Sequence, residues 1–189
     1  MKKKLLPVLL IAFTIILSAL IFILPSITGK NFTYITVKQE LPLARVLNNQ
    51  ADIELVFFGY AGCLDVCTPR IEAIKQWYLT LSKKQQKRIG VRFFDLSIPK
   101  DPQTPDIFIK AFHKNFTGVY LSQKELRTYT KEFNVYFSDS LLKKGEINHS
   151  AHLYITKRTT TNKELRAIYT AFPYNFVLIN SKLKTLLEE

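Results

Sequence analysis

Residues 53–69 read IELVFFGYAGCLDVCTP, and this stretch decides the fold that the rest of the chain is expected to build. The run 53–58, apolar except for Glu54, is typical of a β-strand that is buried on both faces. Pro69 indicates a helix start, because its missing N–H costs nothing in the first turn of a helix. Cys63 and Cys67, the two cysteines of the chain, lie on the turn between this strand and this helix.

A helix start is a favourable place for a reactive sulfur pair. The first turn of a helix has unpaired backbone N–H groups and the positive end of the helix dipole. Both features favour the thiolate over the thiol, and the thiolate is the species that binds soft metals or attacks disulfides. The sequence therefore predicts that Cys63 and Cys67 form either a metal site or a redox pair.

The segment after the cysteines alternates between helical and extended hydrophobic spacing. Two helices and two strands are expected there. The first is a helix with Ile71, Ile74, Tyr78 and Leu81 on one face, and a strand at 91–96 follows it. Next comes a helix that is capped by Thr104, has Pro105 at its first position, and carries Ile107, Phe108, Ala111 and Phe112 on one face. The last is a short strand at 119–121.

The last third of the chain contains clear boundary signals. Ser122 and Glu125 form a capping box, which predicts a helix with Leu126, Tyr129 and Phe133 on its apolar face. We expect a polar loop at 134–150 after it. The final expected elements are strands at 151–156 and 166–172 around a polar turn at 159–163, and a helix capped by Asn175 that carries Phe176, Ile179, Leu183 and Leu187.

This order of elements predicts an α/β domain. Strands joined through helices are expected to be parallel, and the two late strands, joined by a short turn, antiparallel. The result is a mixed sheet with helices on both faces and a cysteine pair at the first strand–helix turn. That is the thioredoxin-like arrangement.

The N-terminal segment predicts a membrane anchor. Residues 5–24 are free of charged side chains, and twenty helical residues span about 30 Å, the thickness of the bilayer's hydrocarbon core. Lys2, Lys3 and Lys4 precede this run, which favours a cytoplasmic amino end. A cleaved signal peptide is the alternative, although its apolar region is usually about 7–15 residues long. Either way the following domain is exported.

The expected organisation therefore has three parts. Residues 1–28 form the cytoplasmic lysine run and transmembrane helix, 29–50 a juxtamembrane spacer, and 51–189 the thioredoxin-like domain. In a bacterial cell the protein would be a single-pass protein of the inner (cytoplasmic) membrane, with its C-terminal domain in the oxidising periplasm. The net charge of +12 is dispersed, with no arginine-rich stripe or nucleic-acid motif, so we expect no nucleic-acid partner.

A soft metal site with two thiolates needs a third ligand, and the chain has three histidines. His113 is expected near the exposed end of a helix. His149 and His152 differ by an odd number, so in an extended segment they point to opposite faces and at most one of them faces the cysteines. His149 precedes the predicted strand, where binding residues collect on loops. From the pattern alone, it is either a ligand or a loop histidine without a specific partner.

Two segments resemble a known family. Residues 57–69 are similar to the copper-site segment of the Sco/SenC family, which reads roughly F-x-G-Y-T-x-C-P-D-V-C-P. Residues 147–150 resemble the family's D-H-S segment, whose histidine is a copper ligand. The resemblance implies a copper ion bound by Cys63, Cys67 and His149. Leu64 stands where the family has proline, and Asn148 where it has an acid.

The same resemblance implies a function and partners. Members of this family are membrane-anchored, thioredoxin-like copper proteins that help to assemble cytochrome c oxidase. The expected partners are the copper-bearing subunit of that oxidase and a thiol reductase or another copper chaperone. The expected function is delivery of copper to, or maturation of, the binuclear copper centre of the oxidase.

Two other interpretations of the cysteine pair stay open. The chain could be a thiol–disulfide oxidoreductase, an enzyme in which Cys63 and Cys67 are the catalytic residues. Three residues separate the cysteines, whereas thioredoxin-type enzymes normally have two, and this spacing favours metal binding. A structural disulfide is the last possibility, but a loop of about five residues would stabilise the domain by only about 2 kcal/mol.

Overall fold

The computed structural model describes residues 13–14, 17–18, 34–41, 51–141, 143 and 145–189. The chain divides into two compact units, residues 1–32 and 33–189, and the second is described below. Apart from residues 13–14 and 17–18, the predicted anchor at 5–24 lies outside the described residues, as does most of the predicted spacer at 29–50. Within the described part of the chain, no helix has the length and apolar character needed to cross a bilayer.

Strand β2 (Ile53–Gly59) lies between two other strands of the sheet and is buried, as predicted. All seven of its residues are buried. It pairs in parallel with β3 (Ile89–Asp95) and antiparallel with β7 (Leu153–Arg158). Its largely apolar sequence follows from this position, because a strand between two neighbours and two helical layers has no face toward water. The one charged residue, Glu54, is buried in ion pairs with Arg92 and Lys163.

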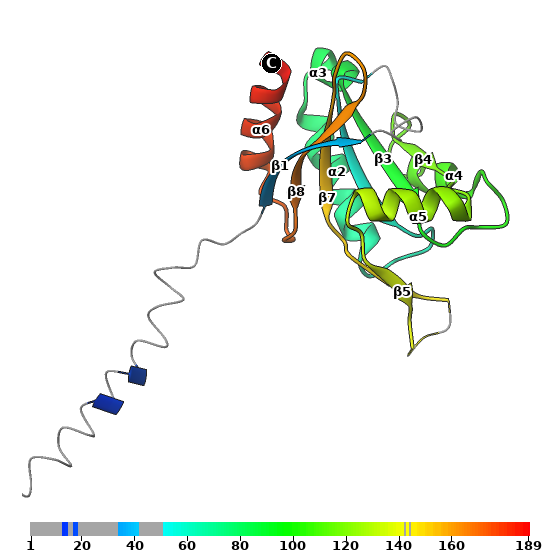
Figure 1. Cartoon of the computed structure of the whole chain (residues 1–189). Coiled ribbons are helices and arrows are strands. Elements are labelled where there is room, and N and C mark those ends of the chain that lie inside the picture. Colours follow the sequence, from blue (N-terminus) through cyan, green and yellow to red (C-terminus); the bar gives the residue numbers. More distant parts are fainter. Residues whose placement is uncertain (1–12, 15–16, 19–33, 42–50, 142, 144) are drawn as a thin grey trace, which may run out of the picture. The chain divides into compact units, whose positions relative to one another are not determined.

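The sheet is mixed and has six strands in the order β1-β8-β7-β2-β3-β4 (Figure 1). The helix-connected strands β2, β3 and β4 (Thr117–Val119) are parallel, and β7 and β8 (Lys163–Tyr169) form the predicted antiparallel hairpin. Strand β1 (Tyr34–Leu41) pairs antiparallel with β8 at the sheet edge, within the range expected to be a spacer. Only Leu41 of β1 is buried, so this strand gives no buried apolar run in the sequence.

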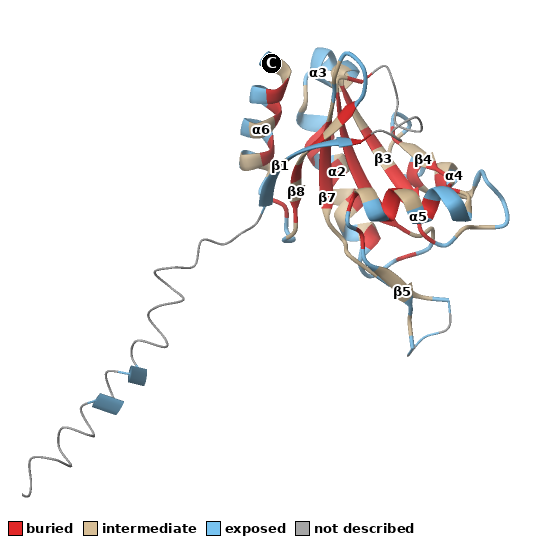
Figure 2. Ribbon diagram, in the orientation of Figure 1, coloured by how far each residue is buried: buried red, intermediate tan, exposed pale blue. Residues whose placement is uncertain are grey.

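Helices cover both faces of the sheet (Figure 2). Alternate residues of β2 point to opposite faces: Ile53 and Leu55 pack with α2 (Cys67–Thr80) and α6 (Phe176–Glu188), whereas Val56 and Phe58 pack with α5 (Gln123–Glu132). The α/β layers predicted from the order of elements are therefore confirmed.

Local signals predicted two of the helix starts. Ser122 accepts a hydrogen bond from the backbone N–H of Glu125, and the Glu125 side chain accepts from the N–H of Ser122, which completes the capping box of α5. Asn175 accepts from the N–H groups of Val177 and Leu178 at the start of α6. A second capping box, at Ser82, begins the short helix α3 (Lys83–Arg88), which the sequence analysis did not predict.

Helix α4 (Thr104–Lys110) differs from the prediction at its start and in its buried face. Thr104 is its first helical residue and not its cap, because the preceding turn is held by the side chain of Asp101, which accepts from the N–H of Gln103. The helix has only seven residues, and Ile107 is 63% exposed. Pro105 and Ile109 are its buried residues, whereas Phe108 and Phe112 of the predicted face pack partly buried against the core.

The predicted polar loop at 134–150 contains a separate two-stranded hairpin. Strands β5 (Phe137–Asp139) and β6 (Ile147–His149) pair antiparallel and stand apart from the main sheet (Figure 1). Each strand has only three residues, and the central one is polar: Ser138 in β5 and Asn148 in β6. Strands this short show no hydrophobic alternation in the sequence. This hairpin places His149 in a strand and not in a loop.

Candidate metal centre

The loop from β2 to α2 begins with a glycine that the site requires. A Cβ atom at position 59 would lie 2.7 Å from Sγ of Cys67 and 3.0 Å from the ring of Phe93. Gly59 therefore lets the Cys67 sulfur pack directly against the end of β2. Gly62, at φ +91°, makes the left-handed turn that precedes Cys63.

The two cysteines are free thiols that are held close together by the first turn of α2. The backbone N–H of Cys67, the first residue of the helix, donates a hydrogen bond to Sγ of Cys63 at 3.2 Å. The carbonyl of Cys63 accepts from the N–H and the hydroxyl of Thr68. Both cysteines are buried, with 4% of Cys63 and none of Cys67 exposed.

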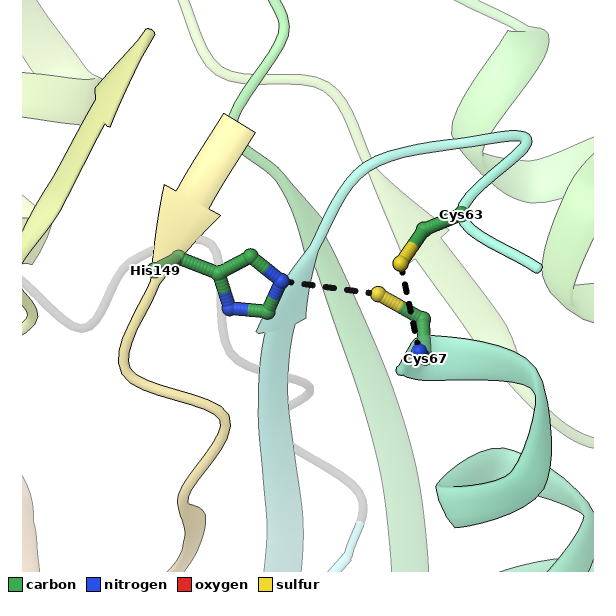
Figure 3. A group of neighbouring side chains, drawn as sticks. All are labelled: Cys63, Cys67 and His149. Atoms are coloured by element: carbon green, nitrogen blue, oxygen red, sulfur yellow. Dashed lines mark hydrogen bonds between the residues drawn. The ribbon is translucent and has the colours of Figure 1, made fainter. Parts of the chain in front are cut away.

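His149 reaches the cysteines from β6 (Figure 3). Its Nε2 atom lies 3.6 Å from Sγ of Cys67, and the three possible ligand atoms of Cys63, Cys67 and His149 all lie within 4.8 Å of one another. The rings of Phe57 and Tyr60 pack edge-on against the imidazole, with centroids 6.4 Å and 6.2 Å away. The structure thus brings together the three residues that the sequence analysis selected.

These distances suit a metal ion. Zinc–ligand bonds are about 2.0–2.3 Å long, and three such donors in a plane around one ion lie about 3.8–4.0 Å apart. The 3.6 Å between Nε2 of His149 and Sγ of Cys67 is slightly shorter than this spacing, and no pair of donors exceeds 4.8 Å, so only small shifts are needed to reach it. Nε2 is the ring nitrogen of His149 that faces the sulfurs. The other ring nitrogen, Nδ1, is buried and has no hydrogen-bond partner among the described residues.

The two thiols have very different acidities. A hydrogen bond from the Cys67 thiol, helped by His149 and by backbone N–H groups, lowers the pKa of Cys63 to about 4, against the opposing effect of burial. The same hydrogen bond and burial raise the pKa of Cys67. Burial and the nearby Cys63 sulfur raise the pKa of the Tyr60 hydroxyl to about 12. In the metal-free protein, Cys63 is therefore the thiolate and Cys67 its proton donor.

The other two histidines lie elsewhere. His152 is outside the three-residue group, and burial followed by the charge of Arg70 lowers its pKa. Only one member of the pair 149 and 152 thus joins the cysteines, as the alternation predicted. His113 packs against Tyr78 and Phe116, and its Nδ1 accepts a hydrogen bond from the N–H of Asn115.

A cavity of about 890 Å³ lies beside the site. The loop before α2 and the β5–β6 hairpin form its walls, which include Tyr60, Cys63, Tyr136 and His149. Leu64, at the position where a proline was expected from the resemblance, is 72% exposed beside it. One side of the three-residue group is therefore open to an approaching molecule.

The sequence analysis missed Asp95, which contacts the cysteine loop. This carboxylate is fully buried at the end of β3, and it accepts a hydrogen bond from the N–H of Ala61. An acid near the end of a largely apolar predicted strand was the available signal.

The SCO1/SenC family model matches residues 25–172. The chain belongs to the SCO1/SenC family. The mitochondrial protein SCO1 of Saccharomyces cerevisiae is 27% identical over 110 residues, which are 53% of this chain and 36% of the yeast protein. The mitochondrial protein SCO2 of the same yeast is 24% identical over 94 residues, 48% of this chain and 31% of that protein. This member thus matches about a third of the length of each yeast relative.

Solved structures of the SCO1/SenC type share the fold. The apo Sco1 protein from Thermus thermophilus is 28% identical, with a TM-score of 0.57 over 72% of this chain and 82% of that one. The copper-bound ScoI of Arabidopsis thaliana has a TM-score of 0.63 over 75% of this chain and 88% of that one. Its identity is only 16%, so this second likeness concerns the fold alone.

Proposed function

We propose that this SCO1/SenC protein binds a copper ion through Cys63, Cys67 and His149. The convergence of two sulfurs and one imidazole nitrogen within 4.8 Å is the observation that carries the proposal. Thiolates are soft ligands that select Cu(I) and zinc, and imidazole suits both metals. The structure of Arabidopsis ScoI with copper bound supports copper as the metal for this fold.

The protein's role would be to deliver copper during the assembly of cytochrome c oxidase. A solved relative, BsSco, is described as a member of the Sco family of cytochrome c oxidase assembly proteins. Delivery requires a site that a second set of ligands can reach, and the cavity beside Cys63 and His149 provides that access. The copper-bearing subunit of the oxidase is the proposed acceptor, and another copper chaperone the proposed donor.

The proposed location follows from the N-terminal sequence. The uncharged run at 5–24 would anchor the chain in the inner membrane, with residues 1–28 as lysine run and anchor and the folded domain in the periplasm. A membrane-bound carrier would share its membrane with the oxidase that it serves.

A thiol–disulfide oxidoreductase is the second candidate function, and the acidity of Cys63 favours it. Its thiolate would attack a partner's disulfide, form a mixed disulfide and release one partner thiolate. Cys67 would then lose its proton and displace the second partner thiolate, leaving a Cys63–Cys67 disulfide. Two electrons would pass to the partner, and a thiol reductase would restore the pair.

A transfer experiment tests copper delivery. Purified protein loaded anaerobically with Cu(I) is mixed with the soluble copper-bearing domain of the oxidase, and the copper content of each protein is measured after separation. We expect transfer from the wild type and none from His149→Ala, which keeps both sulfurs. A wild type that takes up no copper while both thiols are reduced would contradict the proposal.

The same variant separates the two functions. Disulfide exchange needs Cys63 and Cys67 but no imidazole ligand, so His149→Ala would retain reductase activity toward a disulfide substrate. If oxidase assembly in cells survives His149→Ala and is lost in Cys67→Ser, the redox function is favoured. Loss of assembly in both variants supports copper delivery.

A further inference from the structure

Asp95 occupies a position in the sheet that faces the cysteine loop. It is the last residue of β3 and is paired with Gly59, the last residue of β2. The N–H of Leu96 donates to the carbonyl of Gly59 at 2.7 Å, so the two strands stay together up to the start of the loop. The side chain of Asp95 is fully buried at this point.

Both oxygens of the Asp95 carboxylate accept hydrogen bonds from loops. Oδ2 accepts from the N–H of Ala61 at 3.1 Å. Oδ1 accepts from the N–H of Ser97 at 2.8 Å and from its hydroxyl at 2.5 Å. Such bonds are needed because a buried carboxylate without partners is costly. The carboxylate thus joins the cysteine loop to the loop after β3.

The contact with Ala61 acts at the start of the turn that delivers the first sulfur. Gly62 follows in the left-handed conformation, and the N–H of Cys63 then donates to the carbonyl of Tyr60. Movement of Ala61 away from β3 would change the direction in which this turn leaves the sheet. The position of Sγ of Cys63 relative to Cys67 and His149 therefore depends on the bond from Ala61 to Asp95.

The loop on the other side of the carboxylate is held in an unusual conformation. Ile98 has φ +49°, and a left-handed conformation costs a β-branched residue free energy. The two bonds from Ser97 to Asp95 hold the residue just before it. In this conformation of the loop, both Ser97 donors point at Oδ1 of Asp95. Oδ2 is then available to accept from the N–H of Ala61.

We propose that Asp95 is a positioning residue for metal capture, which holds the Cys63 sulfur in place through the Ala61 N–H. This inference rests on the proposed copper site. It adds a residue that is not one of the three proposed ligands and that acts through the backbone of the loop. Removal of partners that orient metal ligands typically lowers metal affinity about 10- to 100-fold.

The test compares Asp95→Asn with two controls. Asparagine keeps the size of the side chain but replaces one acceptor oxygen with an NH₂ donor, so Ala61 and Ser97 can no longer both be satisfied. Ser97→Ala removes the hydroxyl bond and leaves both backbone bonds. Val91→Ala creates a small cavity in the buried part of β3 and lowers stability without touching the loop.

Three quantities are measured on the full chain: Cu(I) affinity by competition with a chelator, the melting temperature, and the exchange rate of the Ala61 amide in the metal-free protein. For Asp95→Asn we expect faster Ala61 exchange and an affinity about 10- to 100-fold lower. Ser97→Ala and Val91→Ala are expected to retain the affinity of the wild type, even where the melting temperature falls.

Two results would overturn the proposal: a wild-type affinity in Asp95→Asn, or an equal loss of affinity in a Val91→Ala variant of similar melting temperature. A wild type that binds no copper would instead refute the proposed function. In that case the role of the hydrogen bond from Ala61 to Asp95 is judged by amide exchange alone. Faster exchange of the Ala61 amide in Asp95→Asn supports the role, and unchanged exchange refutes it.

Discussion

Nε2 of His149 and Sγ of Cys67 lie 3.6 Å apart although 82 positions separate the two residues in the chain. One belongs to a small hairpin outside the main sheet and the other to the first turn of a helix at the end of the central strand. The site therefore depends on how the hairpin packs against the sheet, where Phe57 and Tyr60 flank the imidazole.

The close approach of Cys67 to the sheet predicts the effect of Gly59→Ala. The new methyl group would lie 2.7 Å from the Cys67 sulfur, with the Phe93 ring on another side, so the sulfur must move. Overpacking of this kind typically costs about 1–3 kcal/mol. We expect a lower free energy of unfolding in urea and a lower Cu(I) affinity in a chelator competition.

Gly145→Ala is the matched control for this substitution. At φ +87°, position 145 strains any residue other than glycine. Unlike at position 59, however, no atom lies within 4 Å of the added Cβ. This variant is expected to lose stability and to keep its Cu(I) affinity. Equal affinities of Gly59→Ala and wild type would refute the steric account of position 59.

The acidity of Cys63 predicts the alkylation behaviour of the metal-free protein. With a pKa of about 4, Cys63 is a thiolate throughout the neutral range, so its rate with iodoacetamide should be nearly constant from about pH 5 to about pH 8. Cys67, whose pKa is raised, should stay largely unmodified. Mass spectrometry of peptides after timed quenching measures both rates.

Cys67→Ala tests the cause of this acidity. The hydrogen bond from the Cys67 thiol is the largest stabilising contact of the Cys63 thiolate, so its removal should raise the pKa of Cys63 toward the ordinary value. The alkylation rate would then fall as the pH is lowered toward 5. A pH-independent rate in the variant would assign the acidity to His149 and the backbone N–H groups instead.

The ion pairs of Asp52 predict a pH dependence of stability at the opposite end of β2. Hydrogen bonding to Arg88, followed by the charges of Arg88 and Arg158, lowers the pKa of Asp52 below 3.8. A carboxyl with a lowered pKa in the folded state adds stability that is fully present above its unfolded pKa. This contribution is lost as the pH falls through the folded pKa.

Asp52→Asn should therefore unfold more easily than the wild type at neutral pH, by about 1 kcal/mol for partly exposed ion pairs. The difference should shrink below about pH 4, where the wild-type carboxyl also takes up a proton. Urea unfolding at several pH values measures it. A difference that persists unchanged at low pH would show that Asp52 acts through its packing and not through its charge.

The parts of the fold that the sequence predicts are those with local causes. The largely apolar run of β2 indicates a strand without an exposed face, and its place between two other strands agrees with that. The capping box at Ser122 and the cap at Asn175 satisfy backbone N–H groups within three residues, so they can be read directly. The cysteine pair was placed correctly because a strand end and a helix start are adjacent in sequence.

The parts that the sequence did not predict depend on distant contacts. The β5–β6 hairpin has strands of three residues, too short for a hydrophobic period, and β1 is almost entirely exposed. The contact between Asp95 and Ala61 exists because the parallel register brings Asp95 opposite Gly59. No local pattern encodes that register. In the sequence, Asp95 therefore looks like an ordinary acid near the end of a strand.

The central claim is that one imidazole and two sulfurs bind the same copper ion, and X-ray absorption spectroscopy of the Cu(I)-loaded protein tests it most directly. The account predicts two sulfurs and one nitrogen around copper in the wild type and in His152→Ala, and loss of the nitrogen in His149→Ala. A copper ion with the same neighbours in His149→Ala as in the wild type would contradict it.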